Sequence, residues 1–225
     1  CVFRYNQAVG NGGAWYAQVQ IPNNACTTNF AQTLFYGNSA TRGAAVYAEM
    51  TSGSPGRTYN QNFYNITAYG NTSSASGAGA FEGYQTPNNF VNIKFYNSLL
   101  AGNSPQNYND ITNSGNITLT STYAPTSATN VFANTSSILG ADGKIMTADD
   151  GLLPNVLSPA ISFGDNALLY NNFLDKDIAN QPRIVNTIDA GAYESPYNAP
   201  LTAGNQGIIY VRTTALGDGT GSSWE

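Results

Sequence analysis

Histidine is absent from the sequence, and charged side chains are scarce. Lys and Arg number 8 and Asp and Glu 13, so charged residues make up 9% of the 225-residue chain, against roughly 25% in an average soluble domain. Without histidine, serine and cysteine catalytic triads are excluded. A net charge of −5 with so few basic residues disfavours binding to nucleic acid or to an anionic membrane surface. No stretch approaches the ~20 apolar residues that cross a bilayer.

Asparagine, glycine and aromatic residues are abundant instead. The chain has 29 asparagines, 23 glycines and 12% aromatic residues, so its solubility depends on neutral amides and hydroxyls. This composition is typical of turn-rich extracellular proteins, and the length allows one or two domains with a hydrophobic core.

A turn that ends in asparagine recurs along the first half of the chain. It reads RYN at 4–6, YGN at 36–38, YGN at 69–71 and AGN at 101–103. Three further columns repeat with it: Phe3, Phe35, Ala68 and Leu100; Phe30, Phe63 and Phe95; and Tyr16, Tyr47 and Phe81. A nearly fixed period of roughly 32 residues indicates stacked structural units, each burying one face against its neighbours.

The residues within each unit favour strands over helices. Glycine, asparagine, serine and threonine lie in the middle of every unit and disfavour helix interiors by up to ~1 kcal/mol each. Short apolar runs bounded by turn residues are the strand signal. The fold class is therefore predicted to be all-β, a right-handed parallel β-helix with an irregular C-terminal cap, with the turn asparagines in the left-handed conformation at its corners. A β-sandwich is the alternative, but it gives no reason for the period.

The period fades after residue 104, and the composition shifts. Of the 13 acidic residues, 8 lie between residues 142 and 194. We predict stacked β-helix coils over 1–104, closing coils and a C-terminal cap over 105–195, a linker at 196–207 and the start of a following module at 208–225. On this interpretation the sequence is a fragment of a longer array.

The two cysteines leave their state open. Cys1 and Cys26 occupy different places in the repeat, so a disulfide and two separate small side chains are both compatible with the sequence. An N-terminal cysteine is also the lipid-bearing residue of processed lipoproteins, which is a further alternative.

Several stretches resemble a known family. FYGNSATRGAAVYAE at 35–49 resembles repeats of bacterial surface β-helix proteins, including chlamydial polymorphic outer-membrane proteins. GADGKIMTADDGLLPNVLSPAISFGDN at 140–166 and DIANQPRIVNTIDAGAYE at 177–194 are similar to the end of right-handed parallel β-helix modules in very large secreted proteins of Bacteroidota, the choice-of-anchor Q type. The stretch at 208–225 resembles the opening of such modules.

The resemblance covers about half the chain, with departures at Leu157, Phe163 and Gln181. It implies an extracellular or cell-surface protein of adhesin type, exported by a type 9 secretion system. Its partners would be neighbouring modules of the same parent protein, together with surface glycans or other cell-surface components, with no nucleic acid and no membrane insertion. The resemblance implies no reaction.

Carboxylates are the remaining candidates for catalysis. Glu49, Glu82 and Asp110 are the acids of the repeat region, and Glu49 and Glu82 lie one period apart, near one register. A stacked pair could serve a glycosidase, although solvated surface acids give the same pattern. No catalytic residue is assigned.

The stretch at 140–151 combines acids with glycine turns. Asp142, Asp149 and Asp150 offer the oxygen ligands that Ca²⁺ prefers, without the EF-hand spacing. Calcium is therefore the one metal proposed as a cofactor, and the alternative is a turn whose Asp side chains accept backbone N–H bonds. The later acids Asp165, Asp175 and Asp177 are weaker ligand candidates. Asp189 and Glu194 are expected to hydrogen-bond within the cap.

Tyrosines could also bind sugars. Tyr36 and Tyr69 share one column beside the turns, where they form either a glycan-binding face or a ladder packed along the wall. The sequence thus favours a non-enzymatic adhesin-type structural module that acts as a stiff spacer. A carbohydrate-active β-helix enzyme and a non-catalytic glycan-binding module are the alternatives.

Overall fold

The computed structural model describes residues 1–20, 25–51, 56–85, 89–109, 116–172 and 175–197. These residues are all-β, and every strand pairing within their sheets is parallel. Two 3-10 turns, η1 (Asn166–Leu168) and η2 (Tyr170–Asn172), are the only helical elements among them. No helix in this part of the chain is long and apolar enough to span a membrane.

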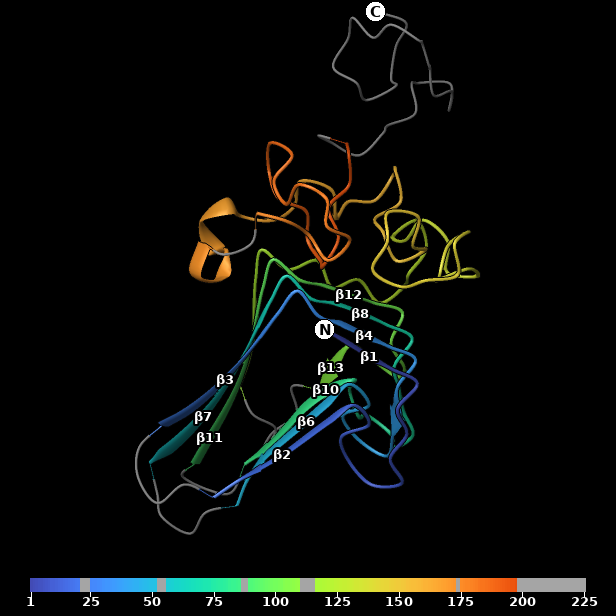
Figure 1. Ribbon diagram of the computed structural model, residues 1–225. Helices are drawn as coiled ribbons and strands as arrows, with labels where there is room; N and C mark the ends of the chain where they lie inside the picture. The colour runs from blue at the N-terminus through green and yellow to red at the C-terminus, as the bar shows by residue number, and fades with distance from the viewer. Residues whose placement is uncertain (21–24, 52–55, 86–88, 110–115, 173–174, 198–225) are drawn as a thin grey trace, which may run out of the picture.

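Three four-stranded sheets lie around a common interior (Figure 1). We call them sheets 1, 2 and 3. Sheet 1 has the order β1 (Val2–Arg4), β4 (Leu34–Tyr36), β8 (Thr67–Tyr69), β12 (Leu99–Ala101); sheet 2 has β13 (Tyr108–Asn109), β10 (Phe81–Gln85), β6 (Val46–Met50), β2 (Trp15–Val19); sheet 3 has β14 (Asn116–Thr120), β11 (Asn89–Tyr96), β7 (Arg57–Tyr64), β3 (Ala25–Ala31). A short parallel pair, β5 (Ser39–Ala40) and β9 (Thr72–Ser73), lies between the sheet 1 and sheet 2 strands along the chain.

The chain visits sheets 1, 2 and 3 in turn and then returns to sheet 1 beside its previous strand. Phe3 pairs with Phe35, Phe35 with Ala68, and Ala68 with Leu100. Because like residues meet across neighbouring strands, this predicted column is confirmed, and the β-sandwich is not what forms.

The predicted phenylalanine column is also confirmed, in sheet 3. Phe30 stacks on Phe63 with 4.9 Å between ring centroids, and Phe63 stacks on Phe95 at 5.0 Å. Phe63 and Phe95 are fully buried, and Phe35 of sheet 1 and Phe81 of sheet 2 meet Phe63 edge to face. The three sheets thus share one aromatic core.

The turn asparagines form an internal amide ladder. Asn6 donates its side-chain N–H to Oδ1 of Asn38 (2.9 Å), Asn38 to Asn71 (2.7 Å), Asn71 to Asn103 (2.8 Å), and Asn103 to Asn107 (2.8 Å). These turn asparagines do not adopt the left-handed conformation themselves, because it falls on the residues before them. Asn65 and Asn97, at the corners that follow β7 and β11, do adopt it, with φ of 51° and 48°. Gly37, Gly70 and Gly102 have φ of 64°, 64° and 65°, and Tyr5 has 53°. The asparagine side chain is thereby turned inward.

The predicted column of Tyr16, Tyr47 and Phe81 is wrong at its third member. Tyr16 pairs with Tyr47, but Tyr47 pairs with Glu82, and Phe81 pairs with Val46. A shift of one residue along a strand reverses the face on which a side chain lies. Phe81 therefore points into the core, while the two tyrosines lie on the outer face of sheet 2.

Residues 124–172 and 175–195 run as an irregular segment along the outer face of sheet 1 (Figure 1). Leu34 and Leu99 of that face are fully buried in a second apolar cluster with Val131, Leu152 and Tyr193 of the segment. Contacts from the segment reach the first repeat as well, where Gln32 donates to the carbonyl of Lys176. The expected cap thus lies along the side of the stack, because strands such as Leu34–Tyr36 are apolar on both faces and need cover on both.

Other predicted features fall partly outside the described residues. The predicted linker at 196–207 and following module at 208–225 lie outside them except for residues 196 and 197. Cys1 and Cys26 are both free, with Cys1 exposed and Cys26 half-buried, so they form no disulfide.

Candidate functional site

The outer face of sheet 2 carries the chemistry-bearing side chains of the repeats. Alternate residues of its strands point outward and meet in two rows across the sheet. The first row contains Tyr16, Tyr47 and Glu82, and the second contains Gln18, Glu49 and Tyr84.

Glu49 and Glu82, which the sequence places near one register, lie in different rows of this face. Glu49 pairs with Tyr84, and Glu82 pairs with Tyr47, so the two carboxylates do not form the stacked pair that could serve a glycosidase. Glu82 is buried, forms an ion pair with Arg42 and accepts the backbone N–H of Gly79. Glu49 is half-buried and accepts the side-chain N–H of Gln18 at 2.7 Å. Asp110, the third acid, lies outside the described residues.

The tyrosines of this face differ in exposure. Tyr16 is 48% and Tyr84 44% exposed, while Tyr47 between them is 5% exposed. Burial, reinforced by the charges of Glu49 and Glu82, raises the pKa of Tyr47 to about 12. Desolvation and the Glu49 carboxylate raise the pKa of Tyr16. Both phenols are therefore neutral hydrogen-bond donors at physiological pH.

Sheet 3 presents a different outer face. Asn116 donates to Asn92 (3.0 Å) and Asn92 to Asn60 (2.9 Å), forming an outer amide ladder. Beside it, Tyr64 stacks on Tyr96 with ring centroids 4.8 Å apart, and Tyr170 of η2 packs on Tyr64 at 4.9 Å. The faces of these rings are largely covered by one another.

Tyr36 and Tyr69, the predicted tyrosine column, do pair on sheet 1. Tyr36 is only 1% exposed beneath the irregular segment, and its hydroxyl accepts a hydrogen bond from Arg4 (3.3 Å). Tyr69 packs edge to face on Phe132 of that segment. The column is ladder packing and offers no glycan-binding face.

The predicted calcium residues Asp142, Asp149 and Asp150 gather around Thr147. The hydroxyl of Thr147 lies 3.5, 2.9 and 3.4 Å from an oxygen of each in that order. Every carboxylate already accepts backbone N–H groups: Asp149 from Ala141 (2.6 Å) and Asp142 (3.1 Å), Asp150 from Met146 and Thr147, and Asp142 from Lys144. Within the described part of the chain, no group of three His, Cys, Asp or Glu residues has a metal-binding arrangement. Calcium binding at these residues stays a prediction.

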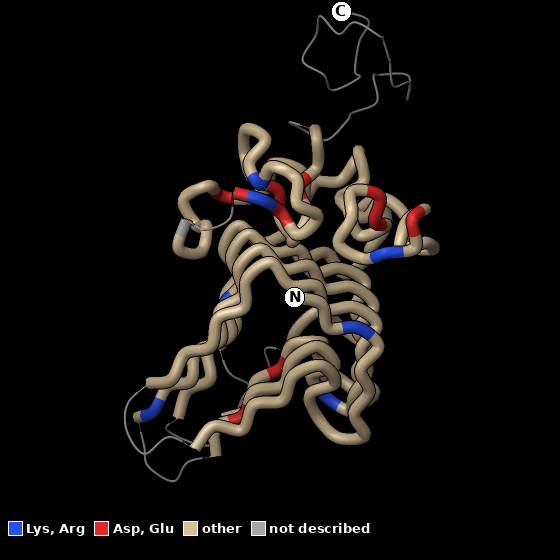
Figure 2. The backbone as a smooth tube through the Cα atoms, viewed as in Figure 1, with Lys and Arg blue, Asp and Glu red and all other residues tan. Residues whose placement is uncertain are grey.

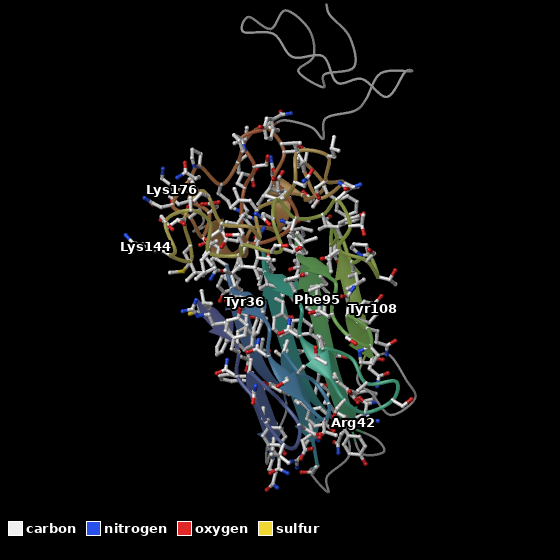
Figure 3. The ribbon with its side chains drawn as sticks, turned by 90° about the vertical axis from the view of Figure 1, so that its right-hand side faces the viewer. Tyr36, Arg42, Phe95, Tyr108, Lys144 and Lys176 are labelled. Carbon is white, nitrogen blue, oxygen red and sulfur yellow. The ribbon has the colours of Figure 1, made fainter. Side chains whose placement is uncertain are left out.

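The remaining acids hold the irregular segment together. Figure 2 shows that the acids cluster in this segment, and Figure 3 shows its lysines, Lys144 and Lys176, above the strands. As expected, Glu194 and Asp189 accept backbone N–H groups. Glu194 accepts those of Val185 and Asp189, and the side chain of Asp189 accepts those of Ser162 and Ser195. The side chain of Asp177 accepts the backbone N–H groups of Ala179, Gln181 and Glu194. The side chain of Asp165 accepts the backbone N–H of Ala167. The backbone carbonyl of Asp175 accepts the backbone N–H of Arg183.

A buried arginine accompanies these carboxylates. Arg183 is fully buried, and one of its N–H groups donates to the carbonyl of Gly191. Burial raises the pKa of Asp189 to about 6 and that of Glu194 to about 8. The stability of the irregular segment is therefore expected to depend on pH.

Sequence reasoning missed Gln18 and Tyr84 as members of the sheet 2 face. Their signal was the alternation of outward positions around Glu49, which becomes readable only when the strand register is known.

No family model matches the chain, and neither the curated proteins nor the solved structures contain a match to it.

Proposed function

We propose that the three sheets form a right-handed parallel β-helix, each repeat being one coil. Two observations support this: parallel pairing in all three sheets, and ladders that run from repeat to repeat in constant register. Right-handed crossover is also the rule for parallel strands joined within one sheet.

We propose that this stack acts as a non-enzymatic, adhesin-type structural module, exported to the cell surface or the extracellular space as part of a larger multidomain protein. The supporting observation is the continuous amide ladder beside the aromatic core, which ties each repeat to the next along the stack. A body held by such nearest-neighbour contacts is a stiff spacer. The composition, with its neutral amides and hydroxyls, suits an extracellular setting.

The spacer function is tested by pulling the full chain from its two ends in an optical trap. The turn asparagines Asn6, Asn38, Asn71 and Asn103 are separated by 32 or 33 positions in the chain. Unfolding is therefore expected in length steps of about 110 Å or multiples of it, from ~3.4 Å per extended residue. A chain that extends gradually at low force, without steps, would contradict a stiff spacer.

The adhesive function is tested with beads that carry the chain, flowed over cells and over polysaccharide films. Retention above that of uncoated beads is expected. The enzyme alternative is tested in parallel by incubating the chain with polysaccharides and measuring new reducing ends. Turnover that disappears in both Glu49→Gln and Glu82→Gln would replace the adhesin proposal with a carbohydrate-active enzyme.

A further inference from the structure

The outer faces of the three sheets differ in which side chains remain exposed to solvent. That of sheet 1 is covered by the irregular segment. On sheet 3, Tyr64 and Tyr96 cover each other's ring faces, and Tyr170 packs on Tyr64. Only sheet 2, among the described sheets, presents exposed tyrosines together with hydrogen-bonding side chains, so it is the face most suited to bind a ligand.

Tyr84 lies at one end of the row that it forms with Glu49 and Gln18. Its side chain is 44% exposed, and it makes no ring contact with any aromatic residue in the described part of the chain. Tyr16 lies two strands away and two residues back, 48% exposed, with one ring face against Tyr47 at 6.0 Å. Two strand spacings and two residues separate the Cα atoms of Tyr16 and Tyr84 by roughly 12 Å, about the length of a disaccharide.

Polar groups lie between the two rings. Glu49 pairs directly with Tyr84, and its carboxylate accepts the amide N–H of Gln18. The Tyr16 phenol hydrogen-bonds the same carboxylate. Each carboxylate oxygen has two lone pairs, so Glu49 can still accept a ligand hydroxyl proton beside these two partners, and Gln18 is exposed. A carboxylate beside an amide and an unstacked aromatic ring is complementary to a sugar, whose hydroxyls donate and whose C–H face packs on the ring.

The charges on the outer face of sheet 2 disfavour acidic and polycationic ligands. The second carboxylate of the face, Glu82, is neutralised by Arg42, and the Tyr16 and Tyr47 phenols stay protonated because their pKa values are raised. An acidic polysaccharide would be repelled by Glu49, and there is no second free carboxylate on the described face to hold a polycation. We propose that Gln18, Glu49 and Tyr84, with Tyr16, bind a neutral glycan chain laid across the strands of sheet 2. This inference rests on the proposed adhesive function and names its ligand class.

The experiment titrates the full chain by calorimetry with neutral hexasaccharides of β-1,4-glucose, β-1,3-glucose, β-1,4-mannose and β-1,4-xylose. Polygalacturonate and chitosan serve as the acidic and cationic probes. Binding of at least one neutral hexasaccharide is expected. Tyr84→Ala and Glu49→Gln are each expected to weaken it by about tenfold or more, the factor that corresponds to one stacking contact or one charge-assisted hydrogen bond.

Matched variants separate binding from folding. Phe90 of sheet 3 is also 44% exposed, so Phe90→Ala removes an equally exposed ring elsewhere and should leave affinity unchanged. Tyr84→Phe keeps the ring and should retain most of the affinity. The melting temperatures of all variants should match that of the original chain, because the altered side chains lie outside the core.

Three results would overturn the site: no binding of any neutral hexasaccharide, binding of the charged polymers alone, or neutral binding that Tyr84→Ala and Glu49→Gln leave intact. If beads carrying the chain still adhere to cells in those cases, the adhesive function survives with another contact surface. If the beads also fail to adhere, the proposed function fails with the site.

Discussion

The internal amide ladder should be worth several kcal/mol at each buried step, and Asn71 is the step that tests this. Its side chain is fully buried, accepts the side-chain N–H (2.7 Å) and backbone N–H (3.2 Å) of Asn38, and donates to Asn103 (2.8 Å) and to the carbonyl of Phe35 (2.9 Å). Asn71→Ala removes these four bonds and a longer one to the carbonyl of Tyr69 (3.4 Å). The buried groups that were bonded to Asn71 then lose a hydrogen-bond partner in a place that water does not reach. At ~1 kcal/mol net for each bond, and more for a buried group left unpaired, the expected loss is about 3–5 kcal/mol.

The matched control is Asn6→Ala at the exposed start of the same ladder. The side chain of Asn6 donates one ladder bond, to Asn38 (2.9 Å), so its removal should cost only about 0.5–1.5 kcal/mol. Urea unfolding followed by far-UV circular dichroism measures both losses, with the m-value checked for constancy. If Asn71→Ala costs no more than Asn6→Ala, the ladder contributes packing alone and the hydrogen-bond reasoning is refuted.

Three further predictions concern the core and the irregular segment. Phe63→Ala should cost about 3–5 kcal/mol in urea unfolding, and more than Phe30→Ala, because Phe63 has stacked rings on both sides whereas Phe30 is half-buried. Burial raises the pKa of Glu194 from 4.5 to about 8, so the folded state binds the proton of this carboxyl more tightly than the unfolded state does. The free energy of unfolding should therefore fall by a few kcal/mol as pH rises from about 4.5 to 8. Glu194→Gln should make the melting temperature less dependent on pH over that range. Asp149→Ala should lower the melting temperature equally in EDTA and in calcium, because it removes two backbone hydrogen bonds; a loss seen only with calcium would instead support the calcium prediction.

The inward columns could be predicted because their spacing hardly varies. Successive ladder asparagines are separated by 32, 33 and 32 positions, and Phe30, Phe63 and Phe95 keep nearly the same intervals. A residue that must meet its copy in the core tolerates no slip, since a slip of one position would turn it to the solvent. Period alone therefore locates these columns.

The register of sheet 2 could not be predicted in the same way. Gln18 and its partner Glu49 are separated by 31 positions, whereas the interval from Glu49 to its own partner Tyr84 is longer. The connections before these strands differ in length, so an alignment of the similar small-residue stretches is one position out of the true pairing. Only backbone pairing determines which side faces outward, so the relation between Glu49, Glu82 and Tyr84 was inaccessible from the sequence.

The place of the irregular segment was partly encoded. Leu34–Tyr36 and Leu99–Ala101 are apolar at every position, which indicates strands buried on both faces. The sequence therefore predicts that another part of the chain covers the outer face of sheet 1. The sequence does not say that residues 124–195 do so, because that contact joins segments far apart in the chain, such as Ala192 and Thr67.

The residues that stabilise this stack and the residues proposed to bind a ligand lie at different positions of the repeat. Phe63 and Asn71 recur because each must match its neighbour in the adjacent repeat. The second row of sheet 2 breaks that rule, since Gln18, Glu49 and Tyr84 occupy equivalent positions with three different side chains. Some outward positions also repeat, such as Asn60 with Asn92 and Tyr64 with Tyr96. An outward row does not have to fill the core, however, so it can acquire a mixed set of donors, acceptors and rings without disturbing the core. In a protein built from like units, a ligand that is not itself periodic along the stack has to be recognised where the repetition stops.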